Sequence, residues 1–497
     1  MNYLQDTENF WSSVGGALQY ASRKSFSLSS SANFIDAFME SNWDKSIVLL
    51  IDELSEMLLA PDAIRDSFLR ALRTIRHSNR ESAIKSVIAA GTFSTMRLTT
   101  SRSNLSPFNI WNSFQIPYFT KDETTKIFDM FAEDNYITID EAVIHDIWAQ
   151  SNGYAQFARP NICSYLFRHP GMTCICGKVV SDNLKTLLDH RSKTITYANW
   201  QKFLVSKLHN EILAYNTFRN MVNYLKAPIA HAAVRLFRTA FAGFLGEVEV
   251  IDRDEDLADL LTSEGVLSRP NRAHLKYHVT SPLIDSLIRL KVIPHQFPAA
   301  PRLQLPPDMP IPRILEECLK CFDKELMREA RWRSSKVSRV PINGSSNVPV
   351  PRESVYDTEL MRILCNWLKP YGWSVTEQWH LKTPEERHRY SDIIVGKPQD
   401  ATRIVFELLA TRDKKIVQDH ITKTPKYMSS VSAHEGWVIH FTCEDSYTPI
   451  WQSSAQLTGG VNMIHLVHDV DFTQMVMHIC WRNQTGNVVI ESHRVSL

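Results

Sequence analysis

Glycine is scarce in this sequence, and an excess of charge of either sign is absent. The 497 residues include 16 glycines and 23 prolines, which excludes collagen-like and low-complexity proteins. The 55 lysines and arginines nearly match the 54 aspartates and glutamates, so the formal net charge is +1. Any basic surface that binds nucleic acid must therefore be a local patch. No apolar run is long enough to span a bilayer, and we expect no membrane association.

Cysteines are few, and their spacing does not define a metal site. Of the eight cysteines, Cys318 and Cys321 have the separation of half a zinc knuckle, but no second Cys/His pair stands at a zinc-site distance. Both lie in an apolar helical pattern, which favours two thiols that face a core. Reduced thiols are typical of an intracellular protein, nuclear or cytoplasmic.

The N-terminal third contains one feature of a nucleotide site. Residues 47–51 are an apolar run, typical of a strand buried on both faces of a parallel sheet, and Asp52 and Glu53 follow it. P-loop ATPases hold Mg²⁺ and polarise the attacking water with such an acidic pair. The alternative interpretation is that both residues cap the next helix at its positive end.

The phosphate-binding loop that should accompany this pair is missing. A second strand over residues 86–91 leads to Thr92, whose hydroxyl suits a terminal phosphate, and residues 63–76 predict the crossover helix. However, the motif G-x-x-x-x-G-K-[ST], which holds the β- and γ-phosphates, does not occur. We therefore expect no tight binding of ATP.

The middle of the chain has a pattern of helices followed by a basic hairpin. Residues 265–280 predict two short strands around a Pro-Asn turn, with Arg269, Arg272 and Lys276 near its tip. This order suggests a winged helix. Such a unit contacts DNA in some proteins and other proteins elsewhere, and the helices here are not basic.

The C-terminal third predicts a second α/β unit, with the order helix, strand, strand, strand, helix, strand. The expected elements cover residues 356–368, 373–379, 390–395, 403–409, 413–427 and 436–441. In the first helix, Leu360, Ile363 and Leu364 form a buried stripe, and Glu359 lies near one edge of it. Three further polar residues, His440, His465 and His468, lie in apolar runs, where a histidine is more often structural than catalytic.

Two carboxylates stand on neighbouring strands of this unit. Asp392 begins one strand, and Glu407 lies at the centre of the next, which is otherwise apolar. A buried carboxylate is costly unless it meets a metal, a cation or a proton. Two carboxylates that converge can hold Mg²⁺ or Mn²⁺, which activates water and neutralises a scissile phosphodiester. The alternative is that Glu407 pairs with a buried arginine or lysine and Asp392 caps the hairpin.

The spacing of Glu359, Asp392 and Glu407 resembles the PD-(D/E)XK restriction-endonuclease-like superfamily. The whole chain resembles Crinkler-type proteins of fungi and oomycetes, in which an ATPase-like region precedes such a nuclease. The matching stretches lie between about residues 45 and 485 and read IVLLIDELSEM, AAGTFS, SPFNIW, HPGMTCICGK, TSEGVLS, TSPLIDSLIR, IVFELLAT, GWVIHFT and IHLVHDVDFT.

The resemblance implies metal-dependent cleavage of nucleic acid, with DNA favoured over RNA, and secretion into a host cell with contacts to host nuclear proteins. It assigns Asp392 and Glu407 to the metal and Glu359 to the helix-borne acid. The superfamily has a lysine two residues after the strand glutamate, where this chain has Leu409. Lys414 and Lys415, or Lys423, are the candidate substitutes, with a solvated basic face as the alternative.

We therefore expect a multi-domain α/β protein with five parts. They are a truncated P-loop NTPase-like region with a parallel sheet (1–125), a helical lid-like region (126–225), a winged-helix-like unit (226–300), a linker (301–352) and a restriction-endonuclease-like domain (353–497). The favoured function is a Mg²⁺-dependent nuclease with a degenerate ATPase-like regulatory region. The alternatives are a catalytically inactive interaction scaffold and an ATPase switch.

Overall fold

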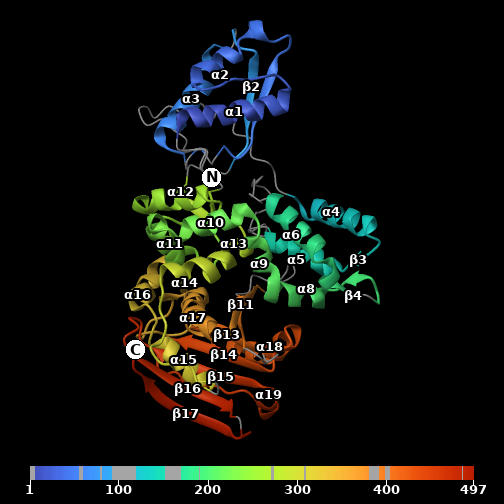
Figure 1. Cartoon of the computed structure of the whole chain (residues 1–497). Coiled ribbons are helices and arrows are strands. Elements are labelled where there is room, and N and C mark those ends of the chain that lie inside the picture. The colour runs from blue at the N-terminus through green and yellow to red at the C-terminus, as the bar shows by residue number, and fades with distance from the viewer. Residues whose placement is uncertain are drawn as a thin grey trace. The chain divides into compact units, whose positions relative to one another are not determined.

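The computed structural model describes residues 6–54, 57, 60–78, 81–91, 119–151, 170–189, 191–269, 274–306, 309–379, 391–397, 403–483 and 485–497. The protein is mixed α/β, with several sheets, and Figure 1 colours it along the chain. It divides into two compact units, residues 1–116 with 259–267 and residues 117–258 with 268–497. Within the described ranges, no helix combines the length and apolar character needed to cross a membrane.

The first unit contains the strand–helix–strand pattern that the sequence predicts. Strands β1 (Ile47–Ile51) and β2 (Ile84–Ala89) pair in parallel, and α3 (Asp62–His77) connects them. Helices α1 (Thr7–Ser22) and α2 (Ser31–Ala37) pack with α3 into one apolar core. That core includes Trp11, Phe34, Phe38, Leu69, Leu72 and Ile84.

The opposite face of these two strands is exposed. Val48, Leu50 and Ile88 are 55%, 72% and 58% exposed, whereas Ile47, Leu49 and Ile51 pack against the core. The expectation that residues 47–51 are buried on both faces is therefore wrong for the described part of the chain. An apolar run indicates that each of its residues can be buried. It does not indicate whether a second layer of helices covers the other face of the strand.

The first half of the second unit is mostly helical, as predicted for residues 126–225. A small sheet with the order β3-β5-β4 joins its helices. The elements are α4 (Lys121–Asp134), β3 (Thr138–Ile139), α5 (Glu141–Ser151), α6 (Pro170–Asp182), α7 (Leu184–Leu187), β4 (Leu188–Asp189), β5 (Thr194–Ile195), α8 (Tyr197–Phe203), α9 (His209–Leu213) and α10 (Asn216–Lys226).

Residues 226–300 form short helices around a small sheet with the order β6-β8-β7. Both strands of the expected hairpin are present, and the turn at residues 270–273, with Arg272, lies outside the described residues. The elements are α11 (His231–Leu236), a π-helical segment (Phe237–Phe241), β6 (Val248–Glu249), α12 (Glu255–Ser263), β7 (Leu267–Ser268), β8 (Lys276–Val279), α13 (Pro282–Leu287), a second π-helical segment (Ile288–Val292) and α14 (Ile293–Gln296).

Residues 301–352, expected to be a linker, are folded. Helices α15 (Ile311–Leu319) and α16 (Lys324–Arg333) lie in this range, and β9 (Ser335–Val337) pairs antiparallel with β10 (Pro349–Pro351). Apolar residues of α15 and α16 belong to the same core as the C-terminal sheet. The helical spacing of these apolar residues explains their burial.

The C-terminal part is built on a seven-stranded sheet with the order β11-β12-β13-β14-β15-β16-β17. Strands β13, β14 and β15 are parallel, and the other neighbours are antiparallel. The elements are α17 (Glu353–Leu368), β11 (Ser374–Trp379), β12 (Ser391–Gly396), β13 (Arg403–Ala410), α18 (Lys414–Ser430), β14 (Glu435–Thr442), α19 (Ser454–Thr458), β15 (Val461–His468), β16 (Met475–Arg482) and β17 (Val488–Val495). The expected order from the first helix to β14 is confirmed.

Helices cover both faces of this sheet, which appears in orange and red in Figure 1. Helices α15 and α17 share one core with Ile404, Phe406 and Leu408 of β13. On the other face, α18 packs against Leu409 of β13 and Val438 of β14. Because successive side chains of a strand point to opposite faces, the even-numbered residues of β13 face α17 and the odd-numbered ones face α18.

A buried arginine joins the middle helices to this sheet. Arg289, on the π-helical segment after α13, is 1% exposed. Its Nη1 lies 2.6 Å from Glu377 of β11, its Nη2 contacts Asp357 of α17, and Asp285 lies 3.6 Å from Nη1. Three carboxylates around one guanidinium carry an excess of negative charge, which favours a proton on one of them. Burial and the nearby Glu377 raise the pKa of Asp285 to about 7, although Arg289 opposes the shift.

This raised pKa predicts a pH-dependent contribution to stability. An unfolded aspartate titrates near about 3.9, so the folded state binds this proton more tightly. The resulting stabilisation is complete below about pH 4 and is lost as pH rises through about 7.

The substitution Asp285→Asn removes this ionisation. Its melting temperature relative to wild type should rise by a few degrees between about pH 5 and about pH 8. Asp252→Asn, at an exposed position, is the control and should show a constant difference. A constant difference for Asp285→Asn as well would contradict this account.

Candidate functional site

The candidate site is centred on the carboxylate of Glu407. Glu407 lies in β13 between Phe406 and Leu408 and is 4% exposed. Its neighbours on the strand face α17, so Glu407 faces α18. A carboxylate in this position needs polar partners, because burying an isolated charge costs several kcal/mol or more, on the order of a domain's whole stability.

The register of β12 and β13 brings the two predicted metal ligands to one region. Ile393 stands opposite Phe406, and Ile394 stands opposite Val405. Continuing this register by one residue places Asp392 opposite Glu407. Ile394 and Val405 pack together on the α18 face, and positions two residues away along each strand share that face. The backbone therefore places positions 392 and 407 on the same face of neighbouring strands.

Helix α18 supplies two polar contacts to Glu407. His420 Nδ1 contacts Glu407 Oε1, and the Thr424 hydroxyl lies 3.3 Å from Glu407 Oε2. Residues four apart lie on the same face of a helix, so one face of α18 presents both side chains. The sequence interpretation missed these two residues. The available signal was a polar pair at this spacing beside the buried stripe of Val417, Ile421 and Met428.

A glycine allows α18 to approach the sheet closely. Gly436 begins the buried part of β14, and a Cβ atom there would lie 2.7 Å from Thr424 Cγ2 and 2.8 Å from Met428 Sδ. Such contacts are too short for a larger residue, so the backbone of β14 and the side chains of α18 meet directly. Gly436 therefore lets Thr424 and Met428 of α18 pack directly on β14.

Of the lysines proposed as substitutes at the Leu409 position, Lys414 and Lys415 lie on a different side of α18 from His420. Leu409 itself is 1% exposed and packs against α18. Lys414 and Lys415 lie in the first turn of α18 and are exposed. At about 100° per residue, they lie about 120° and about 140° around the helix from His420. Lys423, half-buried, lies about 60° from His420 and is the nearest of the candidate lysines on the helix surface.

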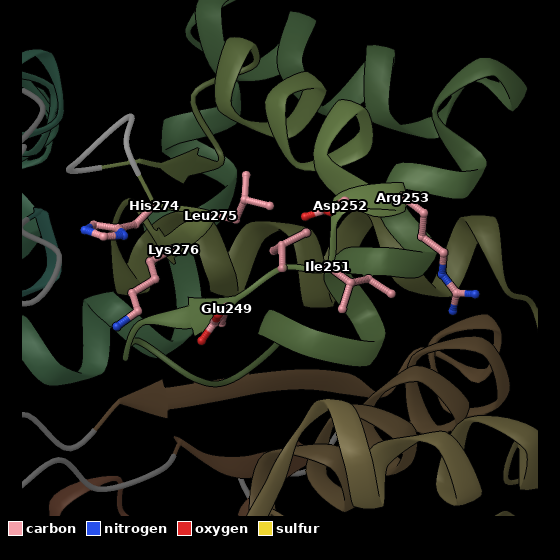
Figure 2. Close-up of a pocket in the computed structure, with 8 residues that line it drawn as sticks. Glu249, Ile251, Asp252, Arg253, His274, Leu275 and Lys276 are labelled. Atoms are coloured by element: carbon pink, nitrogen blue, oxygen red, sulfur yellow. The ribbon is translucent and has the colours of Figure 1, made fainter.

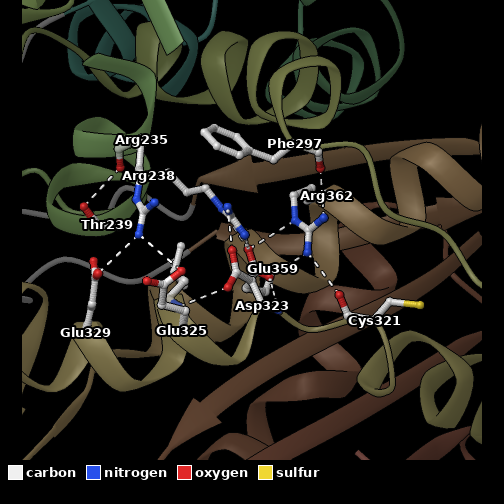
Figure 3. Close-up of polar contacts among 11 residues, drawn as sticks. Arg235, Arg238, Thr239, Phe297, Cys321, Asp323, Glu325, Glu329, Glu359 and Arg362 are labelled. Carbon is white, nitrogen blue, oxygen red and sulfur yellow. Dashed lines mark hydrogen bonds and ion pairs between the residues drawn. The ribbon is translucent and has the colours of Figure 1, made fainter. Parts of the chain in front are cut away.

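Glu359 is not part of this group. It lies on α17, which covers the opposite face of the sheet, and it is fully buried. Figure 3 shows it between Arg238 and Arg362. Arg238 Nε donates to Oε1 at 3.0 Å, Arg362 Nη2 to Oε2 at 2.8 Å, and the Asp323 backbone N–H to Oε2 at 3.0 Å. Burial opposes ionisation, but the two arginines outweigh it and lower the pKa of Glu359.

The acidic pair of the first unit is exposed. Asp52 and Glu53 follow β1, and the Glu53 backbone N–H donates to Asp52 Oδ1 at 2.9 Å. This contact is a local turn interaction, and Glu53 has a positive φ of 50°. Thr92 lies outside the described residues. The structure therefore places two of the three expected nucleotide-site residues together, at the carboxyl end of β1.

The histidines of β14 and β15 form a buried hydrogen-bonded chain. The Arg412 backbone N–H donates to His440 Nε2 at 3.2 Å, and His465 Nε2 lies 2.7 Å from the Ile450 carbonyl oxygen. The Tyr447 hydroxyl lies 3.2 Å from His440 Nδ1 and 2.9 Å from His465 Nδ1. One direction of donation satisfies every atom. The Arg412 N–H donates to His440, His440 to Tyr447, Tyr447 to His465, and His465 to the Ile450 carbonyl oxygen.

Burial keeps these histidines neutral. It lowers the pKa of His440 well below its usual value and that of His465 to about 4. Burial likewise lowers the pKa of His468 to about 4, and His468 contacts the Tyr356 hydroxyl at 3.0 Å. Because the described partners satisfy all three rings, they act as structural groups in this fold, which is the more common role of a core histidine.

Arg269, one of the basic residues expected near the hairpin tip, is paired within residues 226–300. Arg269 Nη1 pairs with Glu255 at 2.8 Å and donates to the Tyr277 hydroxyl at 3.1 Å. A surface depression of about 930 Å³ lies beside β6 and β8, and Figure 2 shows the residues that line it. Its charged and titratable lining residues are Glu249, Asp252, Arg253, His274 and Lys276. Because acidic and basic groups are both present, the depression gives no preference for phosphate.

Outside position 392, whose side chain is not described, the described residues contain no group of three His, Cys, Asp or Glu side chains that could hold a metal ion. Cys318 is buried in the core, and Cys321 packs against it, as expected for core-facing thiols. Comparisons with models of protein families, with curated proteins and with solved structures find no match for the chain. The chemistry of Glu407 and its neighbours is therefore the basis for any functional proposal.

The Glu359 network predicts a large difference between two arginines three residues apart. Arg238→Met leaves the buried Glu359 with one arginine and should lower the free energy of unfolding by about 3–5 kcal/mol. Arg235 is 48% exposed and pairs with Glu329 at 3.2 Å and Glu325 at 3.5 Å. Arg235→Met is the matched control and should cost less than about 1 kcal/mol. Denaturant titration measures both, and equal losses for the two variants would refute the role assigned to Glu359.

Proposed function

We propose that the C-terminal sheet domain is a divalent-metal-dependent phosphodiesterase that cleaves nucleic acid, with DNA as the favoured substrate. The observation that carries the proposal is the shared face of positions 392 and 407, together with the burial of Glu407. Asp392 and Glu407 would hold Mg²⁺ or Mn²⁺, because carboxylate oxygens are the ligands that these hard cations prefer. When bound, such a cation lowers the pKa of a water molecule and neutralises negative charge at the phosphate.

The order of elements supports a restriction-endonuclease-like fold for this domain. Helix α17 is followed by β11, β12 and β13 as an antiparallel meander, then by α18 and the parallel strand β14. The resemblance to PD-(D/E)XK nucleases predicts the two acids on neighbouring strands of this meander. We extend the proposal to the first unit as a degenerate P-loop-like region, supported by the parallel pair β1 and β2, and to residues 226–300 as a winged-helix-like unit.

In this proposal the residues of the chain have distinct tasks. Glu407 and Asp392 bind the cation, and His420 and Thr424 contact Glu407 from α18. Glu359 has no task in cleavage, because it belongs to the buried network with Arg238 and Arg362 on the other side of the sheet. The superfamily lysine, which would stabilise the charged transition state, has no counterpart at Leu409. The stabilisation of that charge must then come from the cation or from a residue beyond position 409.

A second candidate is an interaction scaffold that retains the nuclease-like fold without catalysis. Leu409, 1% exposed in the core, favours it, because an apolar residue in the lysine position removes a group that such chemistry uses. The contact between His420 and Glu407 also offers the carboxylate a partner without a metal. The two candidates differ in one respect: only the first requires Glu407 to bind a divalent cation.

The nuclease proposal predicts that purified protein nicks DNA in the presence of Mg²⁺ or Mn²⁺. Glu407→Gln and Asp392→Asn each remove a metal-binding charge and should lower the cleavage rate on the order of 100-fold or more. Glu491→Gln on the exposed surface of β17 is the matched control and should cleave like wild type. A folded wild type that leaves DNA intact with either cation, or a Glu407→Gln variant with unchanged activity, would favour the scaffold.

The absent phosphate loop predicts that nucleotide does not stabilise the first unit. A ligand that binds the folded state raises the melting temperature as its concentration exceeds the dissociation constant. Millimolar ATP with Mg²⁺ should therefore leave the melting curve of the full chain unchanged. An increase in melting temperature that disappears in Asp52→Asn would instead restore the ATPase switch as a function of this unit.

A further inference from the structure

Helix α18 contains a histidine whose ring is aimed at the carboxylate of the proposed metal site. We propose that His420 is a positioning residue: its Nδ1–H holds Glu407 Oε1 and thereby orients the carboxylate for a divalent cation. This inference rests on the proposed function, because it assigns a role to His420 only if Glu407 binds a metal. His420 and Glu407 are in direct contact, and their side chains are 20% and 5% exposed.

The chemistry of the carboxylate identifies which ring nitrogen of His420 carries the proton. A carboxylate only accepts hydrogen bonds, so the proton of this contact lies on His420 Nδ1. A carboxylate has about four lone-pair sites, so the contacts with His420 and Thr424 do not by themselves prevent Glu407 from binding a cation. The hydrogen bond fixes the rotation of the carboxyl group. In metal sites, outer partners of this kind contribute about 10–100-fold to metal affinity or activity.

Of the two contacts that His420 and Thr424 make with Glu407, that of Thr424 is the weaker. Its hydroxyl lies 3.3 Å from Glu407 Oε2 and 2.9 Å from the His420 carbonyl oxygen. A hydroxyl has one proton, and the shorter contact within the helix competes for it. The methyl group of Thr424 rests close to Gly436, where a Cβ atom would come within 2.7 Å. Thr424 therefore packs against the sheet, and His420 supplies the directional hydrogen bond.

Helix geometry explains why this residue takes the position beside Glu407. The N-cap Asp413 accepts from the Ile416 backbone N–H at 3.0 Å, which fixes the start of α18. From there, Val417, Ile421, Thr424 and Met428 form the buried stripe, and His420 stands at its edge. A residue at the edge of the stripe reaches the sheet and also remains partly open to solvent. His420 therefore contacts Glu407 while part of its side chain remains exposed to solvent.

The test measures Mn²⁺ binding to the full-length protein by calorimetry, with cleavage of DNA as a second readout. Asparagine places its amide nitrogen close to the position of the histidine Nδ1, whereas glutamine places it close to Nε2. His420→Asn should therefore keep nearly the wild-type affinity for Mn²⁺. His420→Gln and His420→Ala should lose about 10–100-fold, and Thr424→Val should lose less. Melting curves establish that each variant is folded.

The outcomes separate this inference from the proposed function. If wild type binds no Mn²⁺, or if Glu407→Gln binds it equally well, the proposed function fails and this inference fails with it. If Glu407→Gln abolishes binding but His420→Ala binds Mn²⁺ like wild type, only the positioning role is overturned. Equal losses in His420→Asn and His420→Gln would also overturn it, because the effect would not depend on the position of the nitrogen. Should His420→Ala fail to fold, the comparison of the asparagine and glutamine variants decides.

Discussion

The burial of one carboxylate in an apolar strand governs the account of this protein. Glu407 lies at the centre of β13, where the flanking Phe406 and Leu408 belong to an apolar core. The free-energy cost of burying a charge at this position is compensated only by a cation, a proton or hydrogen-bond donors. The fold provides donors from α18 and places a second acidic position on the adjacent strand. An arrangement that only filled space would be more stable with an apolar residue at this position.

Two other buried charged residues differ from Glu407 in their partners. Glu359 and Arg289 lie on the α17 side of the domain, and each is surrounded by groups of opposite charge from distant segments. These networks connect the middle helices with α17 and β11. They also explain why residues 301–352 do not behave as a linker, since Asp323 of that segment donates its backbone N–H to Glu359. Breaking such a network leaves a buried charge without compensation, so the two regions are expected to unfold together.

The sequence predicted local order well and long-range partners poorly. The pattern of apolar residues located β11 to β14, and it placed Asp392 and Glu407 on neighbouring strands. The face of Glu359 was not predictable in this way, because its partner Arg238 stands 121 positions earlier in the chain. The exposed face of β1 was missed for a related reason: the apolar run does not encode whether a second layer covers the strand, and the described residues leave this face exposed. His420 escaped notice because its role depends on how closely α18 approaches β14, which Gly436 determines.

The central claim is that residues 392 and 407 share one divalent cation, and a double-mutant cycle of Mn²⁺ affinity tests it most directly. Groups that bind the same ion are strongly coupled, so their substitutions are not additive. The account predicts one Mn²⁺ per chain, a severe loss in Asp392→Asn and in Glu407→Gln, and no further loss when the two changes are combined. Losses that simply add, or an affinity that neither substitution changes, would contradict the claim.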